Sequence, residues 1–157
     1  MSAESDRRRY DIVIAGGGMI GTSLALALAP LGLKVAVVEA VERKAAEQPS
    51  FDERSTALSR STQRMFIAMN LWGEIAAAST PIRHIHVSDR GRFGFSHIDA
   101  QEQGVEALGY VVINRVLGEV LQNALVNEDG IDVLCPARIV DISLQSDAAS
   151  VVIERDD

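Results

Sequence analysis

The order of apolar and polar positions near the N-terminus predicts a strand, a helix and a second strand. Residues 10–15 form a short run rich in β-branched side chains that stops at three glycines, Gly16 to Gly18, as a buried parallel strand would. Apolar residues then recur at helical spacing over 20–28, and a second apolar run over 33–38 ends at Glu39. The N-terminal segment therefore predicts a βαβ unit.

Pro30 lies in the last turn of the predicted helix, just before a helix-stopping glycine, Gly32. A proline removes a backbone hydrogen bond and crowds the preceding turn, which costs about 3 kcal/mol in a helix interior. We therefore expect this helix to end early, before the turn at Leu31 and Gly32.

The middle of the chain has a different pattern. Residues 40–53 are charged and irregular and predict a surface loop, after which a helical pattern runs over 55–69. Strands are expected at 82–88 and 93–98, and the turn at 89–91 between them predicts an antiparallel hairpin. The expected core positions of the helix are Leu58, Met65, Phe66 and Met69.

The last third predicts one helix followed by three strands. Asn114 is a suitable N-cap for a helix that runs to about residue 127, and strands are expected at 131–134, 138–144 and 151–154. A doubly wound sheet needs further parallel strands to cover both faces of the first two, so we expect an N-terminal part of a longer protein. The helix's expected buried stripe is Val116, Leu117, Val120, Leu121, Ala124 and Leu125.

Composition narrows the class of protein. The chain has 157 residues, of which 47% are hydrophobic and 24% charged, as in an ordinary globular domain. Its net charge of −7 repels a phosphate backbone, which argues against nucleic acid as a partner. One cysteine, Cys135, excludes a disulfide framework and a Cys-rich metal site, and we expect it to be a small buried residue. With no membrane-length apolar run and no signal peptide, we expect a soluble, cytoplasmic protein.

Gly16-Gly17-Gly18-Met19-Ile20-Gly21 matches the G-x-G-x-x-G pattern of dinucleotide-binding turns. Gly16 permits the tight turn off the strand, Gly18 lets the backbone approach a pyrophosphate, and Gly21 lets the helix pack closely on the strand. The helix N-terminus then holds the anion. A glycine-rich turn without any ligand is the alternative interpretation.

Glu39 closes the second predicted strand, 18 residues after Gly21. An acidic side chain at this place can accept hydrogen bonds from ribose hydroxyls, and it repels a 2′-phosphate. NADP is therefore disfavoured at this turn, whereas FAD and NAD both remain open.

Three further segments match motifs of one known family. Phe51-Asp52-Glu53-Arg54-Ser55-Thr56-Ala57-Leu58 resembles the F-D-x-R-x-x-A-L segment of the flavin-dependent aromatic hydroxylases of ubiquinone biosynthesis. Ile85-His86-Val87-Ser88-Asp89-Arg90-Gly91 is close to a signature of the 2-octaprenyl-6-methoxyphenol hydroxylase branch. Residues 107–112 with Asn114-Arg115 fit the segment that leads into the family's flavin-contacting helix, so the resemblance spans about residues 10–145.

The resemblance implies a single-component monooxygenase. In such an enzyme NADH or NADPH reduces FAD, O2 forms a flavin hydroperoxide, and one oxygen atom passes to a phenolic ring that here carries a polyprenyl tail. The cofactor does this chemistry while the protein positions it and excludes water. The sequence offers no nucleophile–base set of its own, so no catalytic side chain is assigned.

The resemblance also assigns cofactor-binding residues. Gly16, Gly18 and Gly21 would hold the FAD pyrophosphate and Glu39 the adenosine ribose. Arg54 would lie near the ribityl and phosphate end of the flavin, and Arg115 would be a second flavin contact. From the residues alone, a surface residue that pairs with Asp52 or Glu53 is the favoured interpretation of Arg54. The main chain at Ile139 would meet the adenine.

The expected fold class is α/β, a Rossmann-like βαβ unit with part of a β-sheet substrate domain, incomplete at the C-terminus. Residues 1–9 form a flexible tail, 10–80 the first part of the FAD-binding lobe, 81–110 the substrate-domain hairpin and 111–157 a return to the FAD-binding lobe. The family's Asp-Gly and Gly-Asp cofactor segments are missing, so we expect this chain alone to bind FAD weakly and not to hydroxylate.

A membrane-embedded substrate further implies peripheral contact with the inner face of the membrane, or docking onto partner enzymes of ubiquinone biosynthesis. Two other functions stay open. One is an NAD-dependent Rossmann dehydrogenase, which predicts regular β-α alternation up to residue 150; the other is a non-catalytic nucleotide-binding module. His84 and His86 share one strand face, but without a third ligand at useful spacing we expect no metal.

Overall fold

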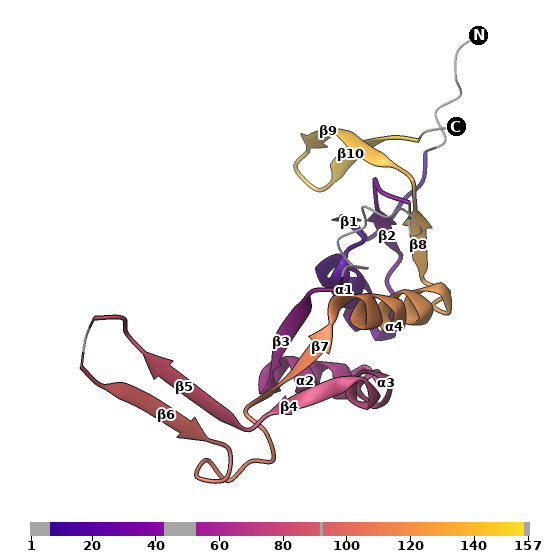
Figure 1. Cartoon of the computed structure of the whole chain (residues 1–157). Helices are drawn as coiled ribbons and strands as arrows, with labels where there is room; N and C mark the ends of the chain where they lie inside the picture. The colour runs from indigo at the N-terminus through magenta and orange to yellow at the C-terminus, as the bar shows by residue number, and fades with distance from the viewer. Residues whose placement is uncertain (1–6, 43–52, 92, 156–157) are drawn as a thin grey trace. The chain divides into compact units, whose positions relative to one another are not determined.

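The computed structural model describes residues 7–42, 53–91 and 93–155 (Figure 1). These divide into two compact units. Unit 1 contains residues 1–50 and 121–157, and unit 2 contains residues 51–120.

Unit 1 is built on a parallel three-stranded sheet in the order β1-β2-β8. Its strands are β1 (Ile12–Ala15), β2 (Val35–Val38) and β8 (Ile131–Leu134). β2 lies in the middle, pairs with both neighbours, and is buried at all four residues, which explains its unbroken apolar sequence. α1 (Met19–Leu28) connects β1 to β2, so the predicted βαβ unit is confirmed.

The predicted early end of the first helix is also confirmed. α1 stops at Leu28, and a single 3₁₀ turn, η1 (Ala29–Leu31), carries the proline. Gly32 then adopts a left-handed conformation with φ of 68°, which a glycine reaches without steric cost. The chain thereby turns directly into β2.

A two-stranded antiparallel ribbon follows the sheet of unit 1. β9 (Arg138–Leu144) pairs with β10 (Ala149–Glu154), with an irregularity between Val152 and Ile153. Ile139 and Ile153 pack against the buried cluster of Val38, Leu134 and Ala137, which attaches the ribbon to the ends of β2 and β8. The three strands predicted for this region are confirmed.

Unit 2 contains an antiparallel sheet in the order β3-β7-β4. Its strands are β3 (Ser55–Ser59), β7 (Gly109–Ile113) and β4 (Ser79–Ile82), and β7 pairs with both others. Two short helices, α2 (Arg60–Ala68) and α3 (Trp72–Ala77), contact these strands. Figure 1 shows them beside the sheet.

The predicted helix over 55–69 was wrong in its first part. Residues 55–59 form β3, and the helix begins only at Arg60, after Ser59, whose Oγ accepts a hydrogen bond from the Thr62 N–H at 3.2 Å. Pairing with the distant β7 overrides the local helical pattern. Of the expected core residues, Leu58 and Phe66 are buried and Met69 is half-buried, whereas Met65 is exposed.

The predicted hairpin is confirmed as β5 (His84–Ser88) and β6 (Phe95–Asp99), which pair antiparallel. The strand expected over 82–88 starts later, because Ile82 belongs to β4. All five residues of β5 are exposed.

α4 (Asn114–Val126) matches the helix predicted from residue 114. Along the sequence it passes from unit 2 into unit 1. Of its expected stripe, Leu117, Val120, Leu121 and Leu125 are buried and Val116 and Ala124 are half-buried. Within the described ranges, none of the helices has the length and apolar character needed to cross a membrane.

Candidate functional site

The glycine-rich turn lies at the carboxyl end of the parallel sheet of unit 1. It connects the last residue of β1 to the first turn of α1, and Glu39 directly follows the neighbouring strand β2. Ligands of open α/β sheets bind at this edge, where helix N-termini and strand ends meet. Four of the predicted site residues, Gly16, Gly18, Gly21 and Glu39, are therefore located in one region of unit 1.

Gly16 and Gly21 are required by the geometry of this turn. Gly16 has φ of +101°, which side chains rarely adopt, and its N–H donates to the carbonyl oxygen of Val38 at 2.8 Å. A Cβ on Gly21 would collide with the carbonyl oxygen of Gly16. The two glycines thus let α1 begin directly against the end of β1.

Glu39 is tied to the turn by its side chain and to β8 by its backbone. One carboxylate oxygen accepts from the Gly17 N–H at 2.7 Å, and the other accepts from the Val41 N–H at 2.8 Å. The Glu39 N–H donates to Leu134 at 2.9 Å, and its carbonyl accepts from Ala137 at 2.8 Å. Because a carboxylate oxygen accepts more than one hydrogen bond, this arrangement leaves acceptor capacity for a ligand hydroxyl.

Gly17 is held from three sides, although sequence reasoning gave it no role. Besides its N–H bond to Glu39, its carbonyl oxygen accepts from Thr22 Oγ1 at 2.9 Å and from Gln122 Nε2 at 3.1 Å. A Cβ on Gly17 would lie 3.0 Å from the Cβ of Glu39, so a side chain there would press on the acidic residue. No local signal pointed to Gln122, which lies 105 residues along the chain.

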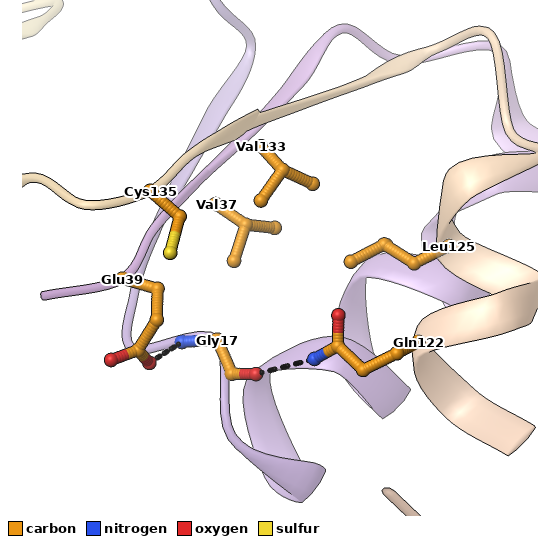
Figure 2. Close-up of a pocket in the computed structure, with 7 residues that line it drawn as sticks. All are labelled: Gly17, Val37, Glu39, Gln122, Leu125, Val133 and Cys135. Atoms are coloured by element: carbon orange, nitrogen blue, oxygen red, sulfur yellow. Dashed lines mark hydrogen bonds between the residues drawn. The ribbon is translucent and has the colours of Figure 1, made fainter. Parts of the chain in front are cut away.

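A small pocket adjoins the turn, between the ends of β2 and β8 and the helix α4 (Figure 2). Gln122 contributes its side-chain oxygen Oε1, which is buried and has no hydrogen-bond partner within the described part of the chain. Cys135 is half-buried, and its Sγ donates to the Val41 carbonyl at 3.3 Å. The lining residues are Gly17, Val37, Glu39, Gln122, Leu125, Val133 and Cys135.

The two predicted arginines lie in unit 2. Arg115, in the first turn of α4, donates to Glu53 Oε1 and to Glu119 Oε1, both at 3.0 Å. These hydrogen bonds, that to Glu53 first, raise the pKa of Arg115 above its ordinary value. Of the two partners considered for Arg54, Glu53 binds Arg115, and Asp52 lies outside the described residues, as does Phe51 of the family motif.

The backbone of Arg54 is joined to the start of α4. Its carbonyl accepts from the Asn114 N–H at 2.8 Å, and the buried Asn114 accepts through Oδ1 from Thr56 Oγ1 at 2.6 Å. These two hydrogen bonds therefore link the start of β3, next to Arg54, to the N-terminus of α4, next to Arg115. Their contacts with a flavin stay a prediction.

Ile139 is the second residue of β9 and packs against Val38 and Leu134 of unit 1. It pairs with Ile153 across the ribbon. The structure places it in the apolar layer beyond the ends of β2 and β8, and its predicted main-chain contact with adenine stays a prediction.

The histidines lie on the exposed hairpin. His84 Nδ1 is 2.8 Å from Asp99 Oδ2, and His86 stacks on Phe95. Across residues 7–42, 53–91 and 93–155, no group of three or more metal-ligating side chains is arranged to hold an ion.

Comparison with known proteins links this geometry to a cofactor. A family profile described as an FAD binding domain matches residues 9–150. Ubiquinone hydroxylase UbiL of Rhodospirillum rubrum is 32% identical over 143 residues, covering 91% of this chain and 33% of that protein. The 3-demethoxyubiquinol 3-hydroxylase of Escherichia coli is 31% identical over 143 residues, covering 87% and 35%.

The fold is similar to that of a solved flavoprotein. PqsL, described as a probable FAD-dependent monooxygenase from Pseudomonas aeruginosa, superposes with a TM-score of 0.71 at 21% identity, over 93% of this chain and 38% of its own. The chain spans about a third of the length of the two curated relatives above.

Proposed function

The chain belongs to the FAD-binding domain family, and from this premise we propose that it is the nucleotide-binding part of a flavin-dependent aromatic monooxygenase. The proposed reaction is hydroxylation of a polyprenylated phenol in ubiquinone biosynthesis. The family match confirms the resemblance seen in the sequence, and two ubiquinone-pathway hydroxylases are among its relatives. The observation that carries the proposal is the glycine turn with Glu39 beside it at the carboxyl end of β2.

The turn supports a pyrophosphate by its backbone. The first N–H groups of α1 have no acceptor within the helix, and the positive end of the helix dipole favours an anion there. Gly16 and Gly21 let the chain enter the helix without a side chain in the way, and Gly18 is the N-cap of that helix. We assign the FAD pyrophosphate to this turn.

The position of Glu39 supports binding of an adenosine ribose with free hydroxyls rather than one that carries a 2′-phosphate. Its carboxylate is fixed by two backbone N–H groups and stands next to the turn. A ribose hydroxyl donates favourably to such a group, whereas a 2′-phosphate would be repelled. Because the proposal places FAD in this turn, NADH or NADPH, the proposed reductant, would bind elsewhere.

Arg54, Arg115 and Ile139 complete the proposed cofactor contacts. A guanidinium has five N–H donors, so Arg115 can keep its two carboxylate partners and still donate to a flavin oxygen. Arg54 belongs to the described part of the family motif and directly precedes β3. The Ile139 main chain is assigned to the adenine.

Bound FAD, once reduced, would supply the activation of O2 and the transfer of one oxygen atom to the phenol. The residues of this chain bind and orient the cofactor. An NAD-dependent dehydrogenase fits less well, because β3, β4 and β7 form an antiparallel sheet and β5 and β6 a hairpin, which breaks the regular alternation it predicts.

We propose further that residues 10–80 and 111–157 serve the FAD-binding lobe and 81–110 the substrate domain. The compact units of the structure group residues 51–80 with 81–120, so part of unit 2 would serve the cofactor. Contact with the inner membrane face or with partner enzymes would bring the tailed phenol to the site. The 157-residue chain by itself should bind FAD weakly and not hydroxylate.

The function is tested in the host. Deletion of the gene should abolish or deplete ubiquinone and lead to accumulation of a polyprenylated phenol that lacks one hydroxyl group, measured by liquid chromatography and mass spectrometry. A plasmid copy should restore ubiquinone, and a Gly21→Val copy should not. Unchanged quinone content in the deletion strain would exclude the proposed pathway.

A further inference from the structure

Gln122 links α4 to the glycine-rich turn, and its contacts point to a role in cofactor binding. We propose that Gln122 is a positioning residue that fixes the peptide between Gly17 and Gly18 with its N–H directed at the bound anion. This inference rests on the proposed function, because the anion is the FAD pyrophosphate.

Two side chains hold the Gly17 carbonyl. Gln122 Nε2 donates to it at 3.1 Å, and Thr22 Oγ1 donates to it at 2.9 Å. Gln122 Nε2 also lies 3.4 Å from Thr22 Oγ1, which is fully buried. Figure 2 shows the amide of Gln122 extending from α4 to the Gly17 carbonyl, opposite the bond from Gly17 to Glu39.

The orientation of that carbonyl determines the orientation of the next N–H. A trans peptide is planar, and its C=O and N–H point in opposite directions. Since the Gly17 oxygen faces Gln122 and Thr22, the Gly18 N–H faces away from them. Gly18 is the N-cap of α1, so its N–H has no acceptor within the helix.

This peptide needs an external restraint because it joins two glycines. Glycine populates conformations on both sides of the φ map with similar ease, so a peptide between two glycines can turn over at little cost. The turned-over peptide would present a carbonyl oxygen, instead of an N–H, to a phosphate. Glu39 fixes the preceding peptide through the Gly17 N–H, and Gln122 and Thr22 fix this one.

The other end of the Gln122 amide argues against a purely structural role. Its Oε1 is buried without a partner among the described residues, and a buried acceptor without a donor destabilises a fold. Its pocket neighbours Val37, Leu125 and Val133 are apolar, so an apolar side chain of the same size would suit the fold better. The glutamine is therefore explained by its donor nitrogen, which reaches the turn.

The test uses the complete gene product, stripped of cofactor, with FAD as the titrant. Gln122→Met keeps the side-chain volume but removes both the donor and the unpaired oxygen. Loss of one hydrogen bond to the turn should weaken FAD binding about three- to tenfold. The Tm of the FAD-free protein should stay equal or rise. Asn123→Met, on the exposed next position of α4, is the matched control and should change neither value.

Gln122→Glu provides a rescue by protonation. A carboxylate cannot donate to the Gly17 carbonyl, but a protonated carboxyl can. The ratio of its FAD dissociation constant to that of the wild type should exceed one at pH 8 and fall toward one as the pH is lowered. Glu39 and Cys135 are titratable groups that line the same pocket. Because both proteins contain them, the ratio removes their contribution to the pH dependence of FAD binding.

The outcomes separate the two proposals. Wild-type FAD affinity in Gln122→Met, or parallel loss of affinity and Tm, would overturn the positioning role and leave the proposed function standing. A wild-type protein that binds no FAD would overturn both.

Discussion

The parallel sheet of unit 1 and the β5–β6 hairpin of unit 2 are both made of short strands, but they are stabilised differently. In β2 every side chain is buried, with exposed fractions of 4% or less. In β5 every residue is exposed, and Val87 keeps 56% of its surface accessible. β2 gains stability from burial on both faces, whereas the hairpin gains it mainly from cross-strand pairs.

Because of this difference, substitutions in the two regions should affect stability and cofactor binding to different extents. The glycine turn is attached to β1 and β2, where backbone and side chains are tightly fixed, so small changes there should affect both stability and cofactor binding. Substitutions in the β5–β6 hairpin should change the free energy of unfolding little. Substitutions in the two regions test the contrast from its largest expected effect to its smallest.

Gly21→Ala should have the largest effect. The added methyl group collides with the Gly16 carbonyl, so α1 must shift away from β1, and we expect a loss of about 3 kcal/mol of unfolding free energy. Urea unfolding measures this. Gly73→Ala in α3 is the control, because its Cβ would meet no atom within 4 Å and a helical alanine should stabilise by up to about 1 kcal/mol. Equal stability of the two variants would contradict close packing of the turn.

Replacing one valine by alanine in each strand, β2 and β5, tests the contrast between the buried and the exposed strand directly. Val37→Ala in the fully buried β2 should cost about 2 kcal/mol, because it removes buried methyl groups and leaves a cavity. Val87→Ala in β5 should change the free energy of unfolding by about 0.5 kcal/mol or less. Similar losses in the two variants would show that the hairpin is buried in the protein in solution.

Glu39→Gln should weaken FAD binding and also lower stability, because an amide can accept from only one of the two backbone N–H groups that the carboxylate binds. Hydrogen bonds to a charged acceptor contribute about 1.5–3 kcal/mol, so we expect an affinity loss of about ten- to a hundredfold in the complete gene product. Fluorescence titration with FAD measures it. Glu128→Gln, at an exposed position in the same unit, is the control. Unaltered affinity in Glu39→Gln would remove the proposed ribose contact.

The smallest expected effect lies in the hairpin, where the titration of the Asp99 carboxyl should be shifted. Hydrogen bonding by the Gln101 N–H, then by Glu102, with the charge of His84 adding to it, lowers the pKa of Asp99 below its ordinary value. A carboxyl with a lowered pKa stabilises the folded state above its unfolded pKa and loses that contribution as the pH falls through the folded pKa. NMR titration of the Asp99 carboxyl checks this, and a midpoint at or above the ordinary value would contradict it.

The same contrast explains what the sequence could predict. β1, α1 and β2 follow from short-range patterns, since a buried strand, a glycine turn and an amphipathic helix are each recognisable from adjacent residues. β3 was missed because it is defined by pairing with β7, far along the chain. Of the two core positions expected in the helical part, Phe66 is buried and Met65 is exposed.

The residues of the candidate site also divide into those that local sequence patterns predict and those that only folding brings together. Gly16, Gly21 and Glu39 belong to one compact motif and could be found from their spacing. Thr22 and Gln122 could not, because one threonine and one glutamine in helices give no signal until folding brings them to the Gly17 carbonyl. Arg54 and Arg115 were identified by resemblance, and the structure adds that Arg115 already binds Glu53 and Glu119.

Binding of FAD by the turn at Gly16–Gly21 is tested most directly by the cofactor content of the complete gene product. The protein would be purified, its visible spectrum recorded, and any released cofactor identified by mass. We expect a yellow protein that releases FAD, and a Gly21→Ala variant that retains much less of it. A colourless wild-type protein that binds NAD in place of FAD would contradict the proposed function and return Arg54 and Arg115 to the role of surface residues.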